Sequence, residues 1–253
     1  SGCELVDLGA GGVKIGSALP TGWGNSLGAP TDDEELVSHH TIEDCLIAHA
    51  GRLHPAGIGV WVGHSPYNVI RHNDVYDLYY SAFSLGWVWG YGPSRAHHNE
   101  VAFNHAHHIG QRVLSDMGCI YTLGISPGTT IHDNHFHDVI SYDYGGWGLY
   151  TDEGSTGVEM TNNLVYRCSR GGFHQHYGKE NRIANTFLPL AASIRSNARA
   201  PRNTRRSFWS TTLCSGTTTA PCWGRTGRTT ITRSTITYTG TQASQSSSPE
   251  VWI

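Results

Sequence analysis

The sequence predicts an all-β chain folded as a right-handed parallel β-helix, a solenoid of stacked coils. Through the first 185 residues, a short phrase recurs in which an apolar residue precedes polar residues that include Asn, and further apolar positions follow. Strand-forming residues and Gly separate the copies, and no helical period is visible. Irregular repeats of this length are typical of solenoids that bury one continuous core. The copies are Ile70–Val75, Ala96–Val101, Ile131–Phe136 and Met160–Val165, at intervals of 26, 35 and 29 residues.

The Asn of each copy is predicted to occupy the same turn, so these side chains should hydrogen-bond from coil to coil. The phrase last appears as Arg182-Ile183-Ala184-Asn185, and the next position, where Asn is expected, holds Thr186. At the other end, Cys3–Gly16 already has the pattern of a coil. We therefore expect the chain to be an incomplete piece of a longer β-helix.

Three strands that contain Gly predict one face of the coil: Gly118–Leu123, Trp147–Asp152 and Gly171–His176. Successive side chains of a strand point to opposite sides. We expect an inward column of Ile120, Leu149 and Phe173, and an outward row of Tyr121, Tyr150 and His174.

Acidic residues flank this outward row. Asp152 and His176 follow two residues after the row, and Asp116 precedes the first strand. Because stacked strands lie about 4.8 Å apart, Asp116 and Asp152 are predicted to fall within the separation of about 5–9.5 Å that glycosidases use for an acid and a base or nucleophile. Glu153 is the substitute for Asp152. The alternative is that Asp152 and Glu153 are ordinary turn residues.

The residues around these acids resemble a known family. The relevant stretches are His98–Val101, Val113–Gly118, Ser141–Ser155 and Gly171–Gly178. They are similar to secreted bacterial right-handed parallel β-helix proteins, and to the glycoside hydrolase family of β-helix α-L-fucosidases and xylanases of plant cell-wall degradation. The resemblance covers residues 1–185, with Cys119 standing where Gly is expected.

That resemblance implies an enzyme that hydrolyses glycosidic bonds in a polysaccharide or oligosaccharide. It maps the two catalytic acids onto Asp116 and either Asp152 or Glu153. It also implies a secreted or periplasmic full-length parent. Sugar orientation is assigned to aromatic and imidazole side chains on the same face, with simple covering of the coil as the alternative role for the rings: His174, His176, Tyr121, Tyr150 and Trp147.

Histidine pairs raise the question of a metal cofactor. Residues i and i+2 of a strand share a face, and neutral imidazole is a common ligand. The pairs are His97/His98, His107/His108, His135/His137 and His174/His176. Hydrogen bonding to sugars or carboxylates explains such rows equally, so we expect no cofactor, with Ca²⁺ or a His-bound metal as the alternative. The four isolated cysteines before residue 185 are expected to be small core residues: Cys3, Cys45, Cys119 and Cys168.

Charge separates the chain into two parts. Residues 1–185 carry 9 basic and 19 acidic residues, a net charge of −10. This charge disfavours nucleic acid and the acidic substrates of a polysaccharide lyase, which is the alternative enzyme on this fold. A non-catalytic glycan-binding or structural β-helix is the alternative from another class. The longest apolar run falls short of the roughly 20 residues that cross a bilayer, so we expect no membrane partner.

The second part, residues 186–253, contains 15 Thr, 10 Ser and 8 Arg among its 68 residues. One reading is a disordered basic tail. If one base is missing from the reading frame near Thr186, its Thr codons decode as Asn, Asp, His or Tyr, and copies of the repeated phrase reappear. We interpret this segment as out of frame, predict that it forms no regular coils, and assign it no function.

Overall fold

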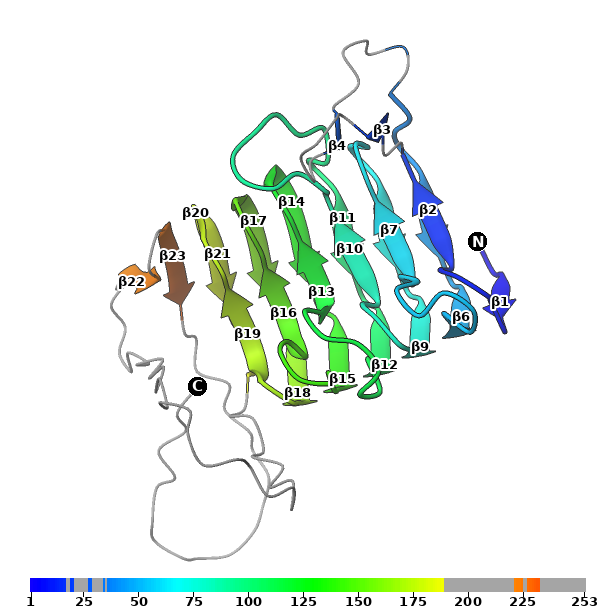
Figure 1. Cartoon of the computed structure of the whole chain (residues 1–253). Coiled ribbons are helices and arrows are strands. Elements are labelled where there is room, and N and C mark those ends of the chain that lie inside the picture. Colours follow the sequence, from blue (N-terminus) through cyan, green and yellow to red (C-terminus); the bar gives the residue numbers. More distant parts are fainter. Residues whose placement is uncertain are drawn as a thin grey trace, which may run out of the picture.

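The structure, a computed structural model, describes residues 1–16, 19–20, 27–28, 34, 36–188, 221–224 and 227–232. Its strands pair almost entirely in parallel and stack into three long sheets, which confirms the predicted all-β parallel β-helix (Figure 1). Among these residues, no helix is long and apolar enough to cross a membrane.

We name the three sheets A, B and C. Sheet A contains β1 (Glu4–Val6), β6 (Leu46–Ala50), β9 (Asp74–Leu78), β12 (His105–Ile109), β15 (His135–Val139) and β18 (Leu164–Cys168). Sheet B contains β2 (Val13–Ile15), β7 (Val60–Val62), β10 (Phe83–Leu85), β13 (Gly118–Thr122), β16 (Trp147–Thr151) and β19 (Gly171–Gln175).

Sheet C contains β5 (Thr41–Glu43), β8 (Val69–Arg71), β11 (Glu100–Ala102), β14 (Ile125–His132), β17 (Ser155–Thr161), β21 (Asn181–Ala184), β23 (Gly227–Thr232) and β22 (Pro221–Gly224), with β20 (Gly178–Lys179) paired to β17. A short antiparallel pair, β3 (Leu19–Pro20) and β4 (Leu27–Gly28), lies outside these sheets. Each complete coil passes through sheet C, then A, then B.

Alternation along the strands builds the core. In sheet B the predicted inward column is confirmed, because Ile120 is in register with Leu149, and Leu149 with Phe173. Ile120 and Leu149 are fully buried, and Phe173 packs against the same core. The column continues through Phe83 and Val60 into the earlier coils. The apolar residues of each strand are thus buried by the coils above and below and by the facing sheets.

The predicted Asn ladder is present at the corner between sheets C and A, where each Asn amide donates to the next side-chain oxygen. Asn73 donates to Asn104 at 2.9 Å, Asn104 to Asn134 at 3.1 Å, and Asn134 to Asn163 at 2.9 Å. The expected Asn99 is wrong for this ladder, since it pairs instead with Asn68 at a second corner. Both corners use the same local phrase, so the true spacing is 31, 30 and 29 residues.

A left-handed residue precedes each Asn of the ladder and turns the chain from sheet C to sheet A. These residues have φ between 53° and 55°: His72, Phe103, Asp133 and Asn162. Three of the four are Asn, Asp or His, the non-Gly types that tolerate this conformation best. The local sequence therefore sets the corner as well as the ladder.

Thr186 occupies the ladder position where Asn was expected, and its hydroxyl accepts a hydrogen bond from the backbone N–H of Asn163 at 3.4 Å. Leu188 is buried in the core, so the coil extends slightly past the predicted boundary at residue 185. Within the predicted tail, β23 pairs in parallel with β21, and β22 pairs antiparallel with β23. The rest of the tail lies outside the described residues, and its out-of-frame origin stays a prediction.

The cysteines follow the core prediction with one correction. Cys45, Cys119 and Cys168 are buried, and all four cysteines of the described coil are free thiols. Cys3 is exposed because it lies on the first coil, which has no described neighbour on its outer side.

Candidate active site

Asp116 lies in the long turn that leads from sheet A into β13. It has φ 55°, its amide donates to the carbonyl of Tyr144 at 2.6 Å, and its own carbonyl accepts from the Tyr80 hydroxyl at 2.8 Å. Gly145 permits this close approach, since a Cβ there would lie 2.8 Å from the Asp116 nitrogen. These two hydrogen bonds fix the backbone of the turn. They hold the Asp116 carboxyl group in place although the residue is exposed.

Asp152 lies at the other end of sheet B, directly after β16. It is only 5% exposed. One carboxylate oxygen accepts a short hydrogen bond from the Tyr121 hydroxyl of the preceding coil. The other oxygen lies 2.9 Å from Nδ1 of His176 in the following coil. Three consecutive coils therefore hold this one carboxylate.

Glu153 is adjacent and more open than Asp152. Its Oε2 accepts a hydrogen bond from the Tyr177 hydroxyl at 2.9 Å, and its Oε1 lies 3.9 Å from His176. Burial and the hydrogen bond to Glu153 raise the pKa of Tyr177 to about 12. This glutamate remains close enough to exchange roles with Asp152.

A pair of tyrosines connects Asp116 to Asp152. Tyr121 and Tyr150 are in register, with ring centroids 4.8 Å apart. Tyr150 donates to Oδ1 of Asp116 at 3.1 Å, while Tyr121 donates to Asp152. Two tyrosine–carboxylate pairs therefore lie in ring contact on the outer face of sheet B. The separation of about 5–9.5 Å between the two carboxyl groups stays a prediction.

Electrostatics distinguish Asp116 within this group. Partial burial raises the pKa of the Asp116 carboxyl, the hydrogen bond from Tyr150 lowers it, and the charge of Asp152 raises it again, with a net increase. Burial also raises the pKa of Tyr121 and Tyr150, assisted by the neighbouring carboxylates. Asp116 therefore keeps its proton to a higher pH than an ordinary aspartate.

The predicted sugar-orienting residues lie on the expected face. Three of them are too deeply buried to contact a sugar. Tyr121 and Tyr150 are 4% and 1% exposed, and Trp147 is 6% exposed. Rings this deeply buried offer no face to a sugar. The two tyrosines instead hold the carboxylates, and Trp147 stacks on His174 with ring centroids 4.1 Å apart.

The two histidines differ in exposure. Burial and the nearby His176 lower the pKa of His174 to about 4, with the charge of Asp152 opposing them. The His176 side chain is 47% exposed beside Asp152. Of the five predicted orienting residues, His176 is thus the one placed to reach a ligand directly.

The long connection between β10 and β11 covers part of this face, projecting beyond the sheet at one edge (Figure 1). Its Trp87 and Trp89 pack against Tyr121, Trp147 and Tyr150. Gly90 of the connection packs closely against Gly154. A Cβ at position 154 would overlap the carbonyl oxygen of Gly90. This cover explains why Tyr121 and Tyr150 are almost completely buried.

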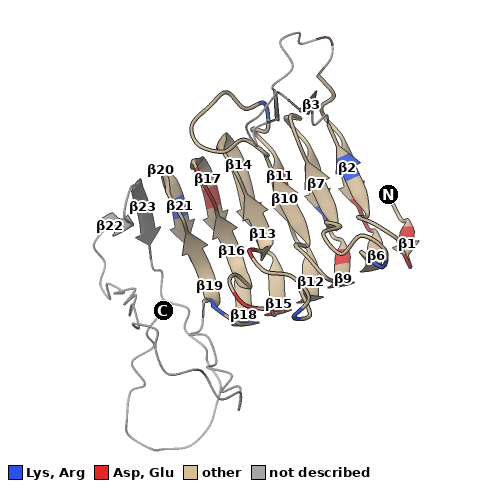
Figure 2. Cartoon of the chain, viewed as in Figure 1, with Lys and Arg blue, Asp and Glu red and all other residues tan. Residues whose placement is uncertain are grey.

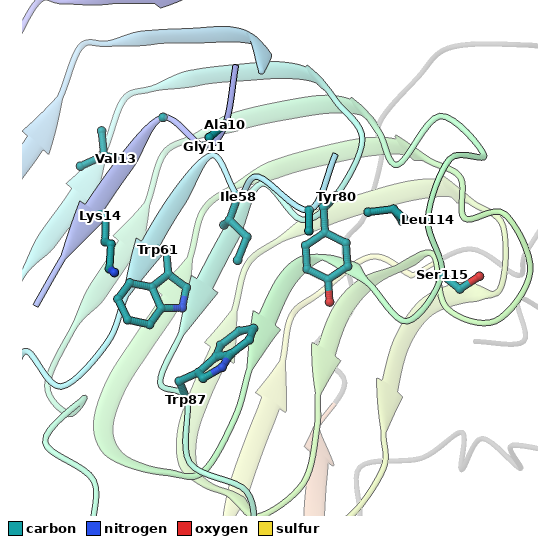
Figure 3. Close-up of a pocket in the computed structure, with 12 residues that line it drawn as sticks. Ala10, Gly11, Val13, Lys14, Ile58, Trp61, Tyr80, Trp87, Leu114 and Ser115 are labelled. Carbon is teal, nitrogen blue, oxygen red and sulfur yellow. The ribbon is translucent and has the colours of Figure 1, made fainter. Parts of the chain in front are cut away.

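A cavity of about 710 Å³ lies on the side of the earlier coils and reaches Leu114 and Ser115, in the turn that carries Asp116. Figure 3 shows Trp61 and Trp87 on one side, with Tyr80 and Ser115 toward the turn that carries Asp116. Lys14 lies 5.1 Å from the centre of the Trp61 ring. Sequence analysis missed these cavity residues, although Val60-Trp61-Val62 alternates like the three aligned strands and places Trp61 in the same outward row as Tyr121.

Sheet A carries the other concentration of functional side chains. The predicted pair His135/His137 shares an outer face there with His105 and His107 of the neighbouring strand. Burial, together with adjacent imidazoles, lowers the pKa of His135 and His107, the latter to about 4. The pair His97/His98 lies elsewhere, with 2.9 Å between the two Nδ1 atoms.

Comparison with known proteins agrees with this architecture. Residues 31–188 match the family model described as "Right handed beta helix region". A solved structure named "Glycoside hydrolase" is similar, with 28% identity and a TM-score of 0.66 over 73% of this chain. The match spans 31% of that longer chain. No curated protein sequence matches.

Proposed function

Because the chain belongs to the right-handed β-helix family, and its sheet B holds paired carboxylates beside an aromatic cavity, we propose that it hydrolyses glycosidic bonds in a polysaccharide. The observation that carries the proposal is the pair of carboxyl groups held by two adjoining tyrosines, Asp116 by Tyr150 and Asp152 by Tyr121. The similarity to a structure named as a glycoside hydrolase supports the same chemistry.

The two carboxyl groups have different environments, and this difference suggests their roles. Asp116, whose pKa is raised, is the general acid that gives its proton to the glycosidic oxygen as the bond to the sugar breaks. Asp152, held as a hydrogen-bond acceptor by Tyr121 and His176, is the base that activates water or the nucleophile that attacks the anomeric carbon. Glu153 is the alternative to Asp152.

The cavity defines where neighbouring sugars bind. Trp61 and Trp87 line it, and aromatic rings stack on the apolar faces of sugars. The described residues include fewer basic than acidic side chains, and Figure 2 shows acidic segments on β1, β9 and β17 and basic segments on β2 and β21. A neutral or weakly charged glycan therefore suits this face better than a polyuronate.

The test is a screen of the protein on neutral and acidic cell-wall glycans, with analysis of the products. We expect new reducing ends without unsaturated sugars, because hydrolysis adds water across the bond. Asp116→Asn and Asp152→Asn should each lower kcat by about 10²–10⁴-fold, since an amide neither donates the proton nor attacks. Glu159→Gln, an exposed acid of sheet C paired with Arg182, is the control that keeps activity.

Unsaturated product ends would identify a lyase instead. Glycan binding without turnover in the unmodified protein would identify a binding module. Full activity in both Asp116→Asn and Asp152→Asn would move the chemistry to other residues, beginning with Glu153.

A further inference from the structure

Four imidazoles form a compact square on the outer face of sheet A, away from the carboxylates of sheet B. His105 is in register with His135, and His107 with His137. Asp74 of β9 extends the His105 row by one strand. None of these side chains takes part in the proposed glycan chemistry.

One oxygen of this cluster lacks a partner among the described residues. Oδ1 of Asp74 is buried and accepts no hydrogen bond there, although the rest of the side chain is open to solvent. It lies 3.2 Å from Nδ1 of His105 and 3.5 Å from Nε2 of His107. A buried carboxylate oxygen without a donor is costly, so the question is what these two nitrogens carry.

The hydrogen-bond network assigns the tautomer of His105. Asp138 is paired with Arg167, whose Nε donates to it at 2.6 Å, so Asp138 is an acceptor. Nδ1 of His137 lies 2.6 Å from Asp138 and 3.2 Å from an Arg167 nitrogen. The shorter contact favours a proton on Nδ1 of His137, which leaves its Nε2 as an acceptor. His105 then donates from Nε2 to that atom across 2.9 Å. Its Nδ1 is left with a lone pair facing Asp74.

His107 completes the set. Its Nδ1 lies 2.6 Å from Nδ1 of the exposed His108, a contact in which either ring can be the donor. When His107 is the donor, its Nε2 keeps a lone pair. Two nitrogen lone pairs and one carboxylate oxygen then face the same point. All three atoms lie within 4.8 Å of one another. Such an arrangement is stable only with a proton or a metal cation between the atoms.

We propose that Asp74, His105 and His107 bind a divalent transition-metal ion, such as Zn²⁺, on the outer face of sheet A. Bonds of about 2.0–2.2 Å to N and O ligands place neighbouring ligand atoms roughly 3–3.6 Å apart, and the two contacts of Asp74 fall in this range. The His105–His137–Asp138 chain supplies the outer partners that orient metal-binding imidazoles in known sites. The ion joins β9 to β12 and leaves positions for water.

A second set in the same square, His105, His135 and His137, also brings three ligand atoms within 4.8 Å. Its nitrogens already have partners, because Nε2 of His105 bonds to His137 and Nε2 of His135 to Tyr166 at 2.9 Å. The Asp74 set is therefore favoured, and the two sets predict different variants to lose the metal.

The test measures metal binding rather than activity, so it is independent of the proposed function. The protein is stripped with a chelator and titrated with Zn²⁺ by calorimetry, and with Co²⁺ by visible absorption, which reports the ligand geometry. We expect about one equivalent to bind. Asp74→Asn and His107→Gln should each weaken binding at least about tenfold, while His135→Gln and the exposed His54→Gln should bind as the unmodified protein does.

Circular dichroism of each variant keeps the comparison valid. Asp74→Asn is the safest change, because it removes a charge from an oxygen that accepts no hydrogen bond in the described coil. Absence of Zn²⁺ and Co²⁺ binding in the unmodified protein would overturn the proposal. So would unchanged binding in Asp74→Asn together with loss in His135→Gln, which would place the ion in the second set.

Discussion

The outer faces of sheets A and B use the same construction and differ in their cover. Each aligns polar and aromatic side chains in register on successive coils. On sheet B, Tyr121 and Tyr150 are almost completely buried beneath the β10–β11 connection. On sheet A, the side chains of His105 and Asp74 are 41% and 46% exposed.

This difference shows which property comes from the repeat and which from the connection. Stacking places the side chains of neighbouring coils close together on both faces. Burial shifts pKa values on both faces, since it raises the pKa of Asp116 beside sheet B and lowers that of His107 on sheet A. On sheet B, the β10–β11 connection adds to the burial of the tyrosine pair. Removing the cover should therefore make sheet B behave like sheet A.

The largest effect is expected from Gly154→Ala, which forces the cover away. Gly154 has φ 76°, and an added Cβ collides with the carbonyl of Gly90. Strain and displacement together should cost about 2–4 kcal/mol of unfolding free energy, measured by urea denaturation. Exposure of Tyr121 and Tyr150 should also bring their pKa values down, which ultraviolet titration follows.

Gly2→Ala is the matched control for this prediction. Gly2 also has positive φ, 66°, but an added Cβ meets nothing within 4 Å among the described residues. It should show the backbone strain alone. If Gly154→Ala and Gly2→Ala lower stability equally and leave both tyrosines buried, the connection does not depend on that contact.

A smaller effect is expected from Tyr150→Phe, which removes one hydroxyl from the covered group. The hydrogen bond from Tyr150 lowers the pKa of Asp116, so its loss should raise that pKa further. A general acid acts in its protonated form, and the basic limb of the pH–activity profile should therefore move to higher pH. We also expect kcat at the optimum to fall by about tenfold, through loss of a charge-assisted hydrogen bond.

Tyr80→Phe is the comparison for that experiment. Its hydroxyl donates to the backbone carbonyl of Asp116 and does not touch the carboxyl group. The basic limb should stay near its original position in this variant. A shift of equal size in both variants would mean that the turn as a whole, rather than the hydroxyl of Tyr150, sets the acidity.

The parts of this site that follow from alternation were predictable from sequence. The inward column through Leu149, the outward row through Tyr150 and the position of Asp152 all depend on a two-residue period within short strands. The same reasoning fails at Asn99, because two corners of each coil use one local phrase and only long-range pairing separates them.

Burial of the tyrosine pair was not predictable in this way. The residues that cover it, Trp87 and Trp89, belong to a connection whose path over the sheet no local pattern specifies. The candidate metal site at Asp74 was not predictable either. It depends on the tautomer of His105, which the hydrogen bonds from His105 to His137 and from His137 to Asp138 determine. The sequence pattern predicts which side chains align on each face, whereas contacts between distant segments determine their burial and their hydrogen bonds.

The smallest effect belongs to the open face, at Asp138. The hydrogen bond from Arg167 is the main cause that lowers the pKa of Asp138 to about 2, below its ordinary 3.8. A carboxyl group with a depressed folded-state pKa stabilises the protein above its unfolded pKa and loses that contribution as the pH falls toward 2. Because Arg167 is 58% exposed and solvent screens the pair, Asp138→Asn should cost only about 1 kcal/mol at pH 7.

That difference from the unmodified protein should shrink between pH 4 and pH 2 in urea denaturation, since the unfolded chain takes up its proton at position 138 first and the folded protein follows as the pH nears 2. Asp143→Asn, which breaks the more exposed pair with Arg170, should change the unfolding free energy by less than about 0.5 kcal/mol. A loss of unfolding free energy in Asp138→Asn that persists at pH 2 would show that the hydrogen-bond geometry at Asp138, rather than its charge, stabilises this part of sheet A. The outer face of sheet A would then depend on fixed hydrogen-bond geometry, as the covered face of sheet B does.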